Sequence, residues 1–143
     1  MKPEHGFADV NGARLYEVAG AGYPLVLMHA SFLDTRMWDS QAEVFARRYT
    51  VIRYDARGHG RSAPPSGQPY ARSDDLKSLL DFLGVPRACL LGLSMGGAVA
   101  VDFALAYPEC TSVLILVNAG LGGFQTSRFS RPAERHPGCA RAS

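Results

Sequence analysis

The fold of this chain is decided by Leu90-Leu91-Gly92-Leu93-Ser94-Met95-Gly96-Gly97-Ala98-Val99-Ala100. The stretch reads as an apolar strand, a sharp turn that carries one serine, and a helix that opens with small residues. Gly92 and Gly96 flank the serine at positions where a Cβ would collide with a neighbouring strand or helix. Such a turn holds the serine hydroxyl out at the carboxyl end of a sheet. The stretch therefore predicts that Ser94 is a nucleophile facing a helix N-terminus, whose N–H groups suit a developing oxyanion.

The pattern G-x-S-x-G is short and also occurs by chance in turns between a buried strand and a core helix. The flanking sequence favours the catalytic interpretation. An apolar run of strand length, 87–91, precedes the turn. The segment from Met95 to Tyr107 contains no proline and ends at Pro108, as expected of a helix. Strand, turn and helix are thus all predicted where the motif needs them.

Composition limits the class of protein. The 143 residues, 47% of them hydrophobic, fit one globular domain, and no apolar run is long enough to span a membrane. Residues 1–5 are not followed by the apolar stretch of a secretory signal. The three cysteines lack C-x-x-C spacing, which argues against a disulfide framework or a zinc site and favours the cytoplasm. The sequence also lacks phosphate-binding glycine motifs, so we expect no cofactor and no metal.

Charge is unevenly distributed. Residues 125–143 hold four arginines and one acid, whereas the remainder of the chain has 11 basic and 12 acidic residues. The body therefore has no basic stripe, and we expect no nucleic-acid partner. Residues 125–143 are rich in Arg, Ser, Ala and Pro and almost free of aliphatic side chains, which predicts a disordered tail.

Hydrophobic periodicity predicts an α/β fold. Two short runs, 6–10 and 13–18, are separated by Asn11-Gly12, a pair that favours a tight antiparallel hairpin. Further strands are predicted at 25–28, 49–54, 87–91 and 113–117, and helices from Thr35, over 73–83 and over 95–107. Strands alternating with helices in this way predict a mostly parallel sheet of about six strands flanked by helices on both faces.

Three motifs follow successive strands: His29-Ala30-Ser31, the glycine-rich run 55–62 (DARGHGRS) and Gly92–Gly97 (GLSMGG). Their order and spacing resemble the α/β-hydrolase fold family over about residues 7–124, and most resemble bacterial esterases, enol-lactonases and cofactor-free haloperoxidases. The resemblance implies a serine-dependent hydrolase that cleaves small carboxylic esters or lactones through an acyl-enzyme. A serine at the turn, where related branches carry an aspartate, speaks against a dehalogenase or an epoxide hydrolase.

The resemblance also assigns roles to residues. Ser94 is the expected nucleophile, and the backbone N–H groups of Met95 and Ser31 are the expected oxyanion hole. Ala30 replaces the glycine that is usual in the family, which is tolerable if its φ stays negative. His29 and His59 are expected to be structural residues of their loops.

The family places a catalytic acid and then a histidine after the serine. After Ser94 this chain has Asp102, Glu109 and Glu134 as its acids and His136 as its one histidine. None of them matches a family position, and Asp102 is expected to face solvent from its helix. The catalytic acid and the catalytic histidine therefore stay unassigned.

These departures predict that residues 1–124 are the amino-terminal part of a hydrolase domain, ended by truncation or a frame shift near Gln125. A natural short protein with a flexible tail is the alternative. The family's strand order would leave 113–117 as an unpaired apolar edge, which predicts self-association. We expect little or no turnover by such a chain. The alternative function is a non-catalytic module of hydrolase fold that binds a ligand or a partner.

Overall fold

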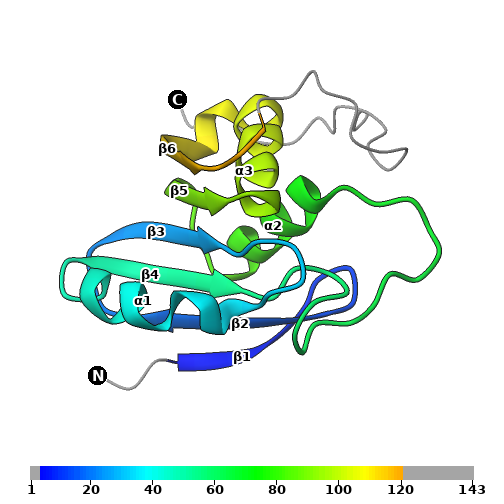
Figure 1. Ribbon diagram of the computed structural model, residues 1–143, viewed down its shortest axis with the longest axis horizontal. Coiled ribbons are helices and arrows are strands. Elements are labelled where there is room, and N and C mark those ends of the chain that lie inside the picture. Colours follow the sequence, from blue (N-terminus) through cyan, green and yellow to red (C-terminus); the bar gives the residue numbers. More distant parts are fainter. Residues whose placement is uncertain (1–3, 121–143) are drawn as a thin grey trace.

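The computed structural model describes residues 4–120, which form one six-stranded sheet in the order β1-β2-β4-β3-β5-β6 (Figure 1). The predicted tail 125–143 and His136 lie outside the described residues. The elements in chain order are β1 (Glu4–Asp9), β2 (Ala13–Ala19), β3 (Tyr23–Met28), the 3₁₀ helix η1 (Thr35–Trp38), α1 (Asp39–Phe45), β4 (Tyr49–Tyr54), α2 (Arg72–Phe82), β5 (Ala88–Leu93), α3 (Met95–Ala106), the 3₁₀ helix η2 (Pro108–Cys110) and β6 (Thr111–Val117).

The sheet opens with the predicted hairpin. β1 and β2 are antiparallel, and Asn11 and Gly12 between them have φ values of 56° and 93°. Both residues accept a positive φ, which is what a tight hairpin turn requires. β2 also pairs antiparallel with β4, whereas β3 with β4, β3 with β5 and β5 with β6 are parallel pairs. The predicted fold class is confirmed.

Apolar side chains on both faces of the sheet make two cores. On one face β3 and β4 pack with α2 and α3, and the buried residues there include Val26, Ile52, Leu76, Leu80 and Phe103. On the other face they pack with η1 and α1, and the buried residues are Leu25, Leu27, Trp38, Ala42, Val51 and Leu91. Successive residues of β3 enter opposite cores because side chains alternate along a strand. The sheet is therefore covered on both faces, as its continuous apolar runs predict.

The segment after β3 differs from the prediction in one respect. The helical pattern that starts at Thr35 begins as the 3₁₀ helix η1 and becomes an α-helix only at Asp39. The reason is local: Met37 N–H donates to the carbonyl of Asp34, and Arg36 N–H donates to the Asp34 carboxylate. The first of these bonds closes a three-residue turn, which defines a 3₁₀ helix.

Helices α2 and α3 begin and end within one residue of their predicted bounds. Two aspartates, Asp74 and Asp75, stand in the first turn of α2, where carboxylates suit the helix dipole. Pro108 follows two residues after the end of α3. Across residues 4–120, the structure contains no helix whose length and hydrophobicity would let it cross a membrane.

Candidate active site

Ser94 occupies the sharp turn between β5 and α3. Its φ of 52° and ψ of −110° lie in a region that side chains rarely adopt. The Ser94 N–H donates to the carbonyl of Val117 at 2.9 Å, and the Ser94 carbonyl accepts from Ala98 N–H at 3.0 Å. The residue is exposed. The backbone of the turn is thus fixed on both sides while the serine side chain faces outward.

Two glycines make this turn possible by close backbone contact. A Cβ on Gly96 would lie 2.3 Å from the carbonyl oxygen of Met28 at the end of β3. A Cβ on Gly92 would lie 2.3 Å from the backbone of Gly96 itself. No side chain fits in either place, because neither backbone can move aside. The glycines predicted to flank the serine are therefore required by contacts with β3 and α3.

The N-terminus of α3 lies directly beside the serine. Met95 is the first residue of α3, so its N–H has no acceptor within the helix. Ser94 stands at the capping position, yet its side chain makes no capping hydrogen bond. The hydroxyl is therefore not engaged in capping the helix, and the first N–H groups of α3 remain available to an anion.

The loop after β3 is held by His29. The His29 ring is buried, with 2% of its surface exposed. Its Nδ1 lies 2.8 Å from the carbonyl of Ala30, and its Nε2 accepts from the N–H of Ala56 at 2.9 Å. Because Nε2 is an acceptor, the ring is neutral and Nδ1 is the donor. Burial lowers the pKa of His29, and both ring nitrogens are occupied, so the geometry favours a structural role.

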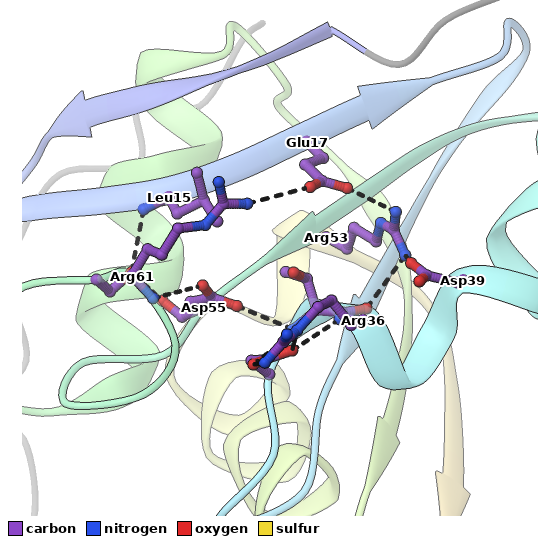
Figure 2. A network of polar contacts seen from close by, with 10 residues as sticks. Leu15, Glu17, Arg36, Asp39, Arg53, Asp55 and Arg61 are labelled. Carbon is purple, nitrogen blue, oxygen red and sulfur yellow. Dashed lines mark hydrogen bonds and ion pairs between the residues drawn. The ribbon is translucent and has the colours of Figure 1, made fainter.

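Asp55 ties the same loop to the glycine-rich segment 55–62. The buried carboxylate accepts from the N–H of Thr35 and from the N–H of Arg61, both at 2.9 Å (Figure 2). A Cβ on Gly60 would collide with the carboxylate at 2.1 Å. Asp55 follows β4 directly, and its side chain bridges the loops that end β3 and β4. The carboxylate therefore holds together the two loops that follow β3 and β4, at the carboxyl ends of these strands.

Segment 55–62 is itself anchored to α2. Arg57 donates to both carboxylate oxygens of Asp75, at 3.0 and 2.5 Å, and both side chains are buried. The Arg57 guanidinium also stacks 4.1 Å above the centre of the Tyr70 ring. Arg14 lies 3.4 Å from the same Asp75 carboxylate. Because Arg57 donates two hydrogen bonds to Asp75 and both side chains are buried, this ion pair anchors segment 55–62 to α2.

Residues 30–32 belong to the loop that follows β3. The non-glycine residues with positive φ in the range 4–120 are Asn11, Phe32, Ser94 and Asn118. Ala30 is not among them, so its φ is negative and alanine fits at the position where the family usually has glycine. Phe32 has a φ of 65° and exposes 98% of its surface. Sequence reasoning missed Phe32, and a bulky residue in the left-handed region carries no local sequence signal.

The structure brings some of the predicted site residues together. Ser94 and Met95 are adjacent at the turn, and Ser31 belongs to the loop after β3. A Cβ on Gly96 would also lie 2.8 Å from the carbonyl of His29, so this loop packs against the start of α3. Ser31 therefore lies in a loop that adjoins the turn.

Other candidates lie elsewhere. Asp102 is exposed on α3, as predicted, and Glu109 is exposed in η2. Glu134 and His136 lie outside the described residues. Of the histidines in residues 4–120, His5 lies on β1, and His29 and His59 hydrogen-bond to backbone groups of residues 30, 56 and 57 and not to Ser94. The part of the chain that the structure describes thus offers Ser94 no hydrogen-bonded base.

An open cleft of about 610 Å³ lies beside α1, away from these residues. Its lining residues come from β2, α1, β4 and the turns that follow β2 and α1, and include neither Ser31 nor Ser94 nor Met95. Arg53 lies in its wall between Glu17 and Asp39, each 2.6 Å away (Figure 2). The lining of the cleft holds three carboxylates, Glu17, Asp39 and Glu43, and two arginines, Arg47 and Arg53, so acidic groups are in excess.

Comparison with known proteins identifies the family. A family model described as the alpha/beta hydrolase family matches residues 25–142. The match spans well over half of the chain, and the strand order and the serine turn described above agree with it. The chain belongs to the alpha/beta hydrolase family.

Three similar proteins illustrate the relationship. An uncharacterised protein of Mycobacterium tuberculosis is 35% identical over 82% of this chain and 36% of its own length. The 3-oxoadipate enol-lactonase 2 of Acinetobacter baylyi is 37% identical over 66% of this chain and 36% of its own length. The crystal structure of a hydrolase from Pseudomonas aeruginosa PA01 superposes with a TM-score of 0.76 at 37% identity, covering 81% of this chain and 46% of that one.

The relatives are named for different hydrolase activities, so they do not define one substrate. Other relatives are named as an epoxide hydrolase and as putative carbamate hydrolases. The chain spans about 36% of the length of the two curated relatives described above. The comparisons therefore establish a hydrolase family and leave the substrate to be inferred from the site.

Proposed function

We propose that this chain carries the nucleophile and the oxyanion hole of a hydrolase that cleaves carboxylic esters or lactones. The observation that carries the proposal is the backbone of Ser94, which is held at φ 52° and ψ −110° with the residue exposed beside the first N–H groups of α3. A strained turn of this kind persists only where the surrounding contacts enforce it. The glycine contacts with β3 and α3 supply that enforcement.

In the proposed reaction the Ser94 Oγ attacks the carbonyl carbon of the ester. The hydroxyl proton passes to a base, and the carbonyl oxygen becomes an oxyanion. The N–H groups of Met95 and Ser31 are proposed to bind this oxyanion, and one such donor is worth about 10²–10³ in rate. The base then gives the proton to the leaving oxygen as its bond to the carbonyl carbon breaks, which releases the alcohol and leaves an acyl-enzyme that water hydrolyses. In a lactone the leaving alcohol stays attached to the acyl group.

The substrate class rests on two supports. The residue at the turn is a serine, whose hydroxyl forms the ester intermediate of acyl transfer. One relative, 37% identical, is an enol-lactonase, which agrees with the cleavage of a carboxylic ester bond. We propose that the catalytic acid and histidine come from residues outside the range 4–120, and that residues 1–124 form the amino-terminal part of a hydrolase domain. As part of the proposal the reaction is assigned to the cytoplasm, in agreement with the free thiol of Cys89.

A second candidate is a ligand-binding module of hydrolase fold. The observation that favours it is the cleft beside α1, whose lining includes none of the proposed catalytic residues. Such a module has no use for a reactive serine. The reactivity of Ser94 therefore separates the two functions.

The test is acylation by p-nitrophenyl acetate, followed by p-nitrophenolate release and by peptide mapping. We expect about one acetyl group per chain, on Ser94, followed by little further turnover, because an oxyanion hole without a base keeps only about 10³–10⁴ of acceleration over water. Ser40, which is exposed on α1, is the internal control and should be acetylated at least about 10²-fold more slowly.

One variant completes the test. Ser94→Ala should abolish the burst of p-nitrophenolate, because it removes the proposed nucleophile. Equal acetylation of Ser40 and Ser94 in the folded chain would contradict the proposal and favour the binding module.

A further inference from the structure

The loop that carries Ser31 is anchored at its far end through the backbone of Thr35. The Thr35 N–H donates to the Asp55 carboxylate at 2.9 Å, and the Thr35 carbonyl accepts from Nη1 of Arg53 at 3.1 Å. Arg53 and Asp55 are two residues apart, so their side chains leave the end of β4 on the same side. Thr35 is buried. Both backbone groups of one buried residue are therefore bound by side chains at the end of β4.

The near end of the same loop is anchored to the residue that follows Asp55. The His29 ring accepts from the N–H of Ala56 at 2.9 Å. Residues 30–34 are thus closed between two anchors, and both anchors are bound by segment 53–56. Because so few residues span the gap, a movement of either anchor changes the backbone of the loop between them.

Between the anchors the loop forms a strained turn. The Leu33 N–H donates to the carbonyl of Ala30 at 3.3 Å, which closes a four-residue turn whose third residue is Phe32. Phe32 has a φ of 65°, and a positive φ at this place is typical of a type II turn that prefers glycine. Such strain persists only where the surrounding contacts impose it. The anchors at His29 and Thr35 are the contacts that hold the ends of this turn.

We propose that Arg53 is a positioning residue of the oxyanion hole, because its bond to the Thr35 carbonyl keeps the strained turn in place. The inference rests on the proposed function, in which the Ser31 N–H binds the oxyanion. Without this donor the turn can relax toward a negative φ at Phe32. Ser31 directly precedes Phe32, so its N–H moves with the turn. A displacement of about 1 Å is enough to cost roughly 10²-fold in rate.

Arginine suits this position because one guanidinium serves three groups. Its Nη2 lies 2.6 Å from Glu17 of β2, and its Nη1 lies 2.6 Å from Asp39 at the start of α1 while also donating to Thr35 (Figure 2). The planar guanidinium fixes the direction of each donor, whereas a lysine ammonium is a single point of charge. A lysine at this position would follow the two carboxylates and give up the neutral carbonyl.

The first test is the rate of Ser94 acetylation by p-nitrophenyl acetate in the full chain carrying Arg53→Lys. We expect the rate constant at saturating ester to fall by at least about 10-fold, because an oxyanion donor is misplaced. The ester concentration that gives half of the maximal rate should change by less than about twofold, since the oxyanion hole acts on the transition state and not on ground-state binding.

A second variant at the same position separates positioning from stability. Arg53→Met also removes the charge, so it should unfold at a lower urea concentration than Arg53→Lys, while its acetylation should be slowed to the same extent as in Arg53→Lys. A residue that acts through stability alone would give rates that follow the unfolding midpoints. If Arg53→Met fails to fold, the comparison of Arg53→Lys with the control decides.

Arg36→Met is the matched control. Arg36 is the neighbour of Thr35, and its guanidinium binds the Asp34 carboxylate at 2.6 Å. Its hydrogen bonds go to Asp34, so the variant leaves both backbone bonds of Thr35 in place. The Arg36 side chain is 81% exposed, and exposed pairs contribute little, so the acetylation rate should stay within about twofold of the wild type.

Amide hydrogen exchange tests the loop without reference to the reaction. The N–H groups of Leu33 and Thr35 should exchange at least about 10-fold faster in Arg53→Lys than in the wild type, with the amides of α2 unchanged. Unchanged exchange at Leu33 and Thr35 would overturn the proposal, and so would wild-type acetylation of Ser94 in Arg53→Lys. Acetylation of Ser94 no faster than that of Ser40 in the wild type would instead refute the proposed function, and the positioning role with it.

Discussion

The two sides of the candidate site are held by different forces. The turn that carries Ser94 is held by backbone packed against backbone, since Gly92 and Gly96 leave no room for a Cβ. The loop that carries Ser31 is held by side chains that accept backbone hydrogen bonds: His29 accepts from Ala56 N–H, and Asp55 accepts from the N–H groups of Thr35 and Arg61. A substitution that adds a Cβ to either glycine should therefore destabilise the turn. Loss of a hydrogen-bond acceptor, or protonation of His29, should destabilise the loop.

Gly96→Ala tests the packed side and should have the largest effect. The new Cβ would meet the carbonyl of Met28 at 2.3 Å, and the strand cannot give way cheaply. We expect the free energy of unfolding to fall by about 3 kcal/mol, measured by urea titration. Gly120→Ala is the control, because no atom lies within 4 Å of its added Cβ, and it should change stability by less than about 0.5 kcal/mol. Equal effects would refute steric control of the turn.

Asp55→Asn tests the hydrogen-bonded side. The amide would keep one acceptor oxygen and turn its NH₂ group toward a backbone N–H, of either Thr35 or Arg61. We expect a loss of about 2 kcal/mol, because a buried N–H is left without an acceptor. Asp81→Asn removes an exposed carboxylate that binds Lys77 and should cost less than about 0.5 kcal/mol. If both variants unfold at the wild-type urea concentration, Asp55 does not hold the loop.

His29 should make the stability of the loop after β3 depend on pH, whereas the packed turn at Ser94 has no such titrating group among the contacts described above. Burial lowers the pKa of His29 in the folded chain, so the unfolded chain binds the proton more readily. The contribution of neutral His29 is complete above about pH 6.5 and is lost as the pH falls toward the lower folded pKa. The slope from this one group is at most about 1.4 kcal/mol per pH unit.

Urea titrations of the wild type and of His29→Gln at a series of pH values isolate this slope. The difference between the two chains should shrink as the pH falls through that window. A difference that stays constant with pH would show that His29 is not held as the neutral ring.

Phe32→Asn should have the smallest effect, and its sign is opposite. Phe32 is almost fully exposed at a φ of 65°, so the chain bears the strain of a left-handed aromatic residue without burying it. Asparagine adopts this conformation more readily. We expect thermal unfolding to shift upward, by roughly 0.5–1 kcal/mol in stability. Destabilisation would show that the Phe32 side chain has a packing role.

The difference between the two sides also explains what the sequence could predict. The turn at Ser94 was predictable because its requirements are local: an apolar run, glycines two residues either side of the serine, and a helix without proline. The hairpin at Asn11-Gly12 was predictable for the same reason. The strand order agreed with the family resemblance.

The hydrogen bonds of the loop could not be predicted. Asp55 reaches Thr35 across twenty residues, and Arg57 reaches Asp75 across eighteen, so no short pattern links the partners. The positive φ of Phe32 and Asn118 likewise depends on where the chain must turn in space. A catalytic acid and histidine were left unassigned from the sequence, and residues 4–120 bring neither to Ser94.

The most direct measurement of the central claim is the site at which a fluorophosphonate modifies the folded chain. The reagent places a phosphoryl oxygen where the oxyanion would form, so its reaction tests the serine and its donors together. The account predicts slow modification confined to Ser94, absent in Ser94→Ala and absent after unfolding in urea. Modification spread over several serines, or none at all in the folded chain, would contradict the claim that Ser94 is a nucleophile.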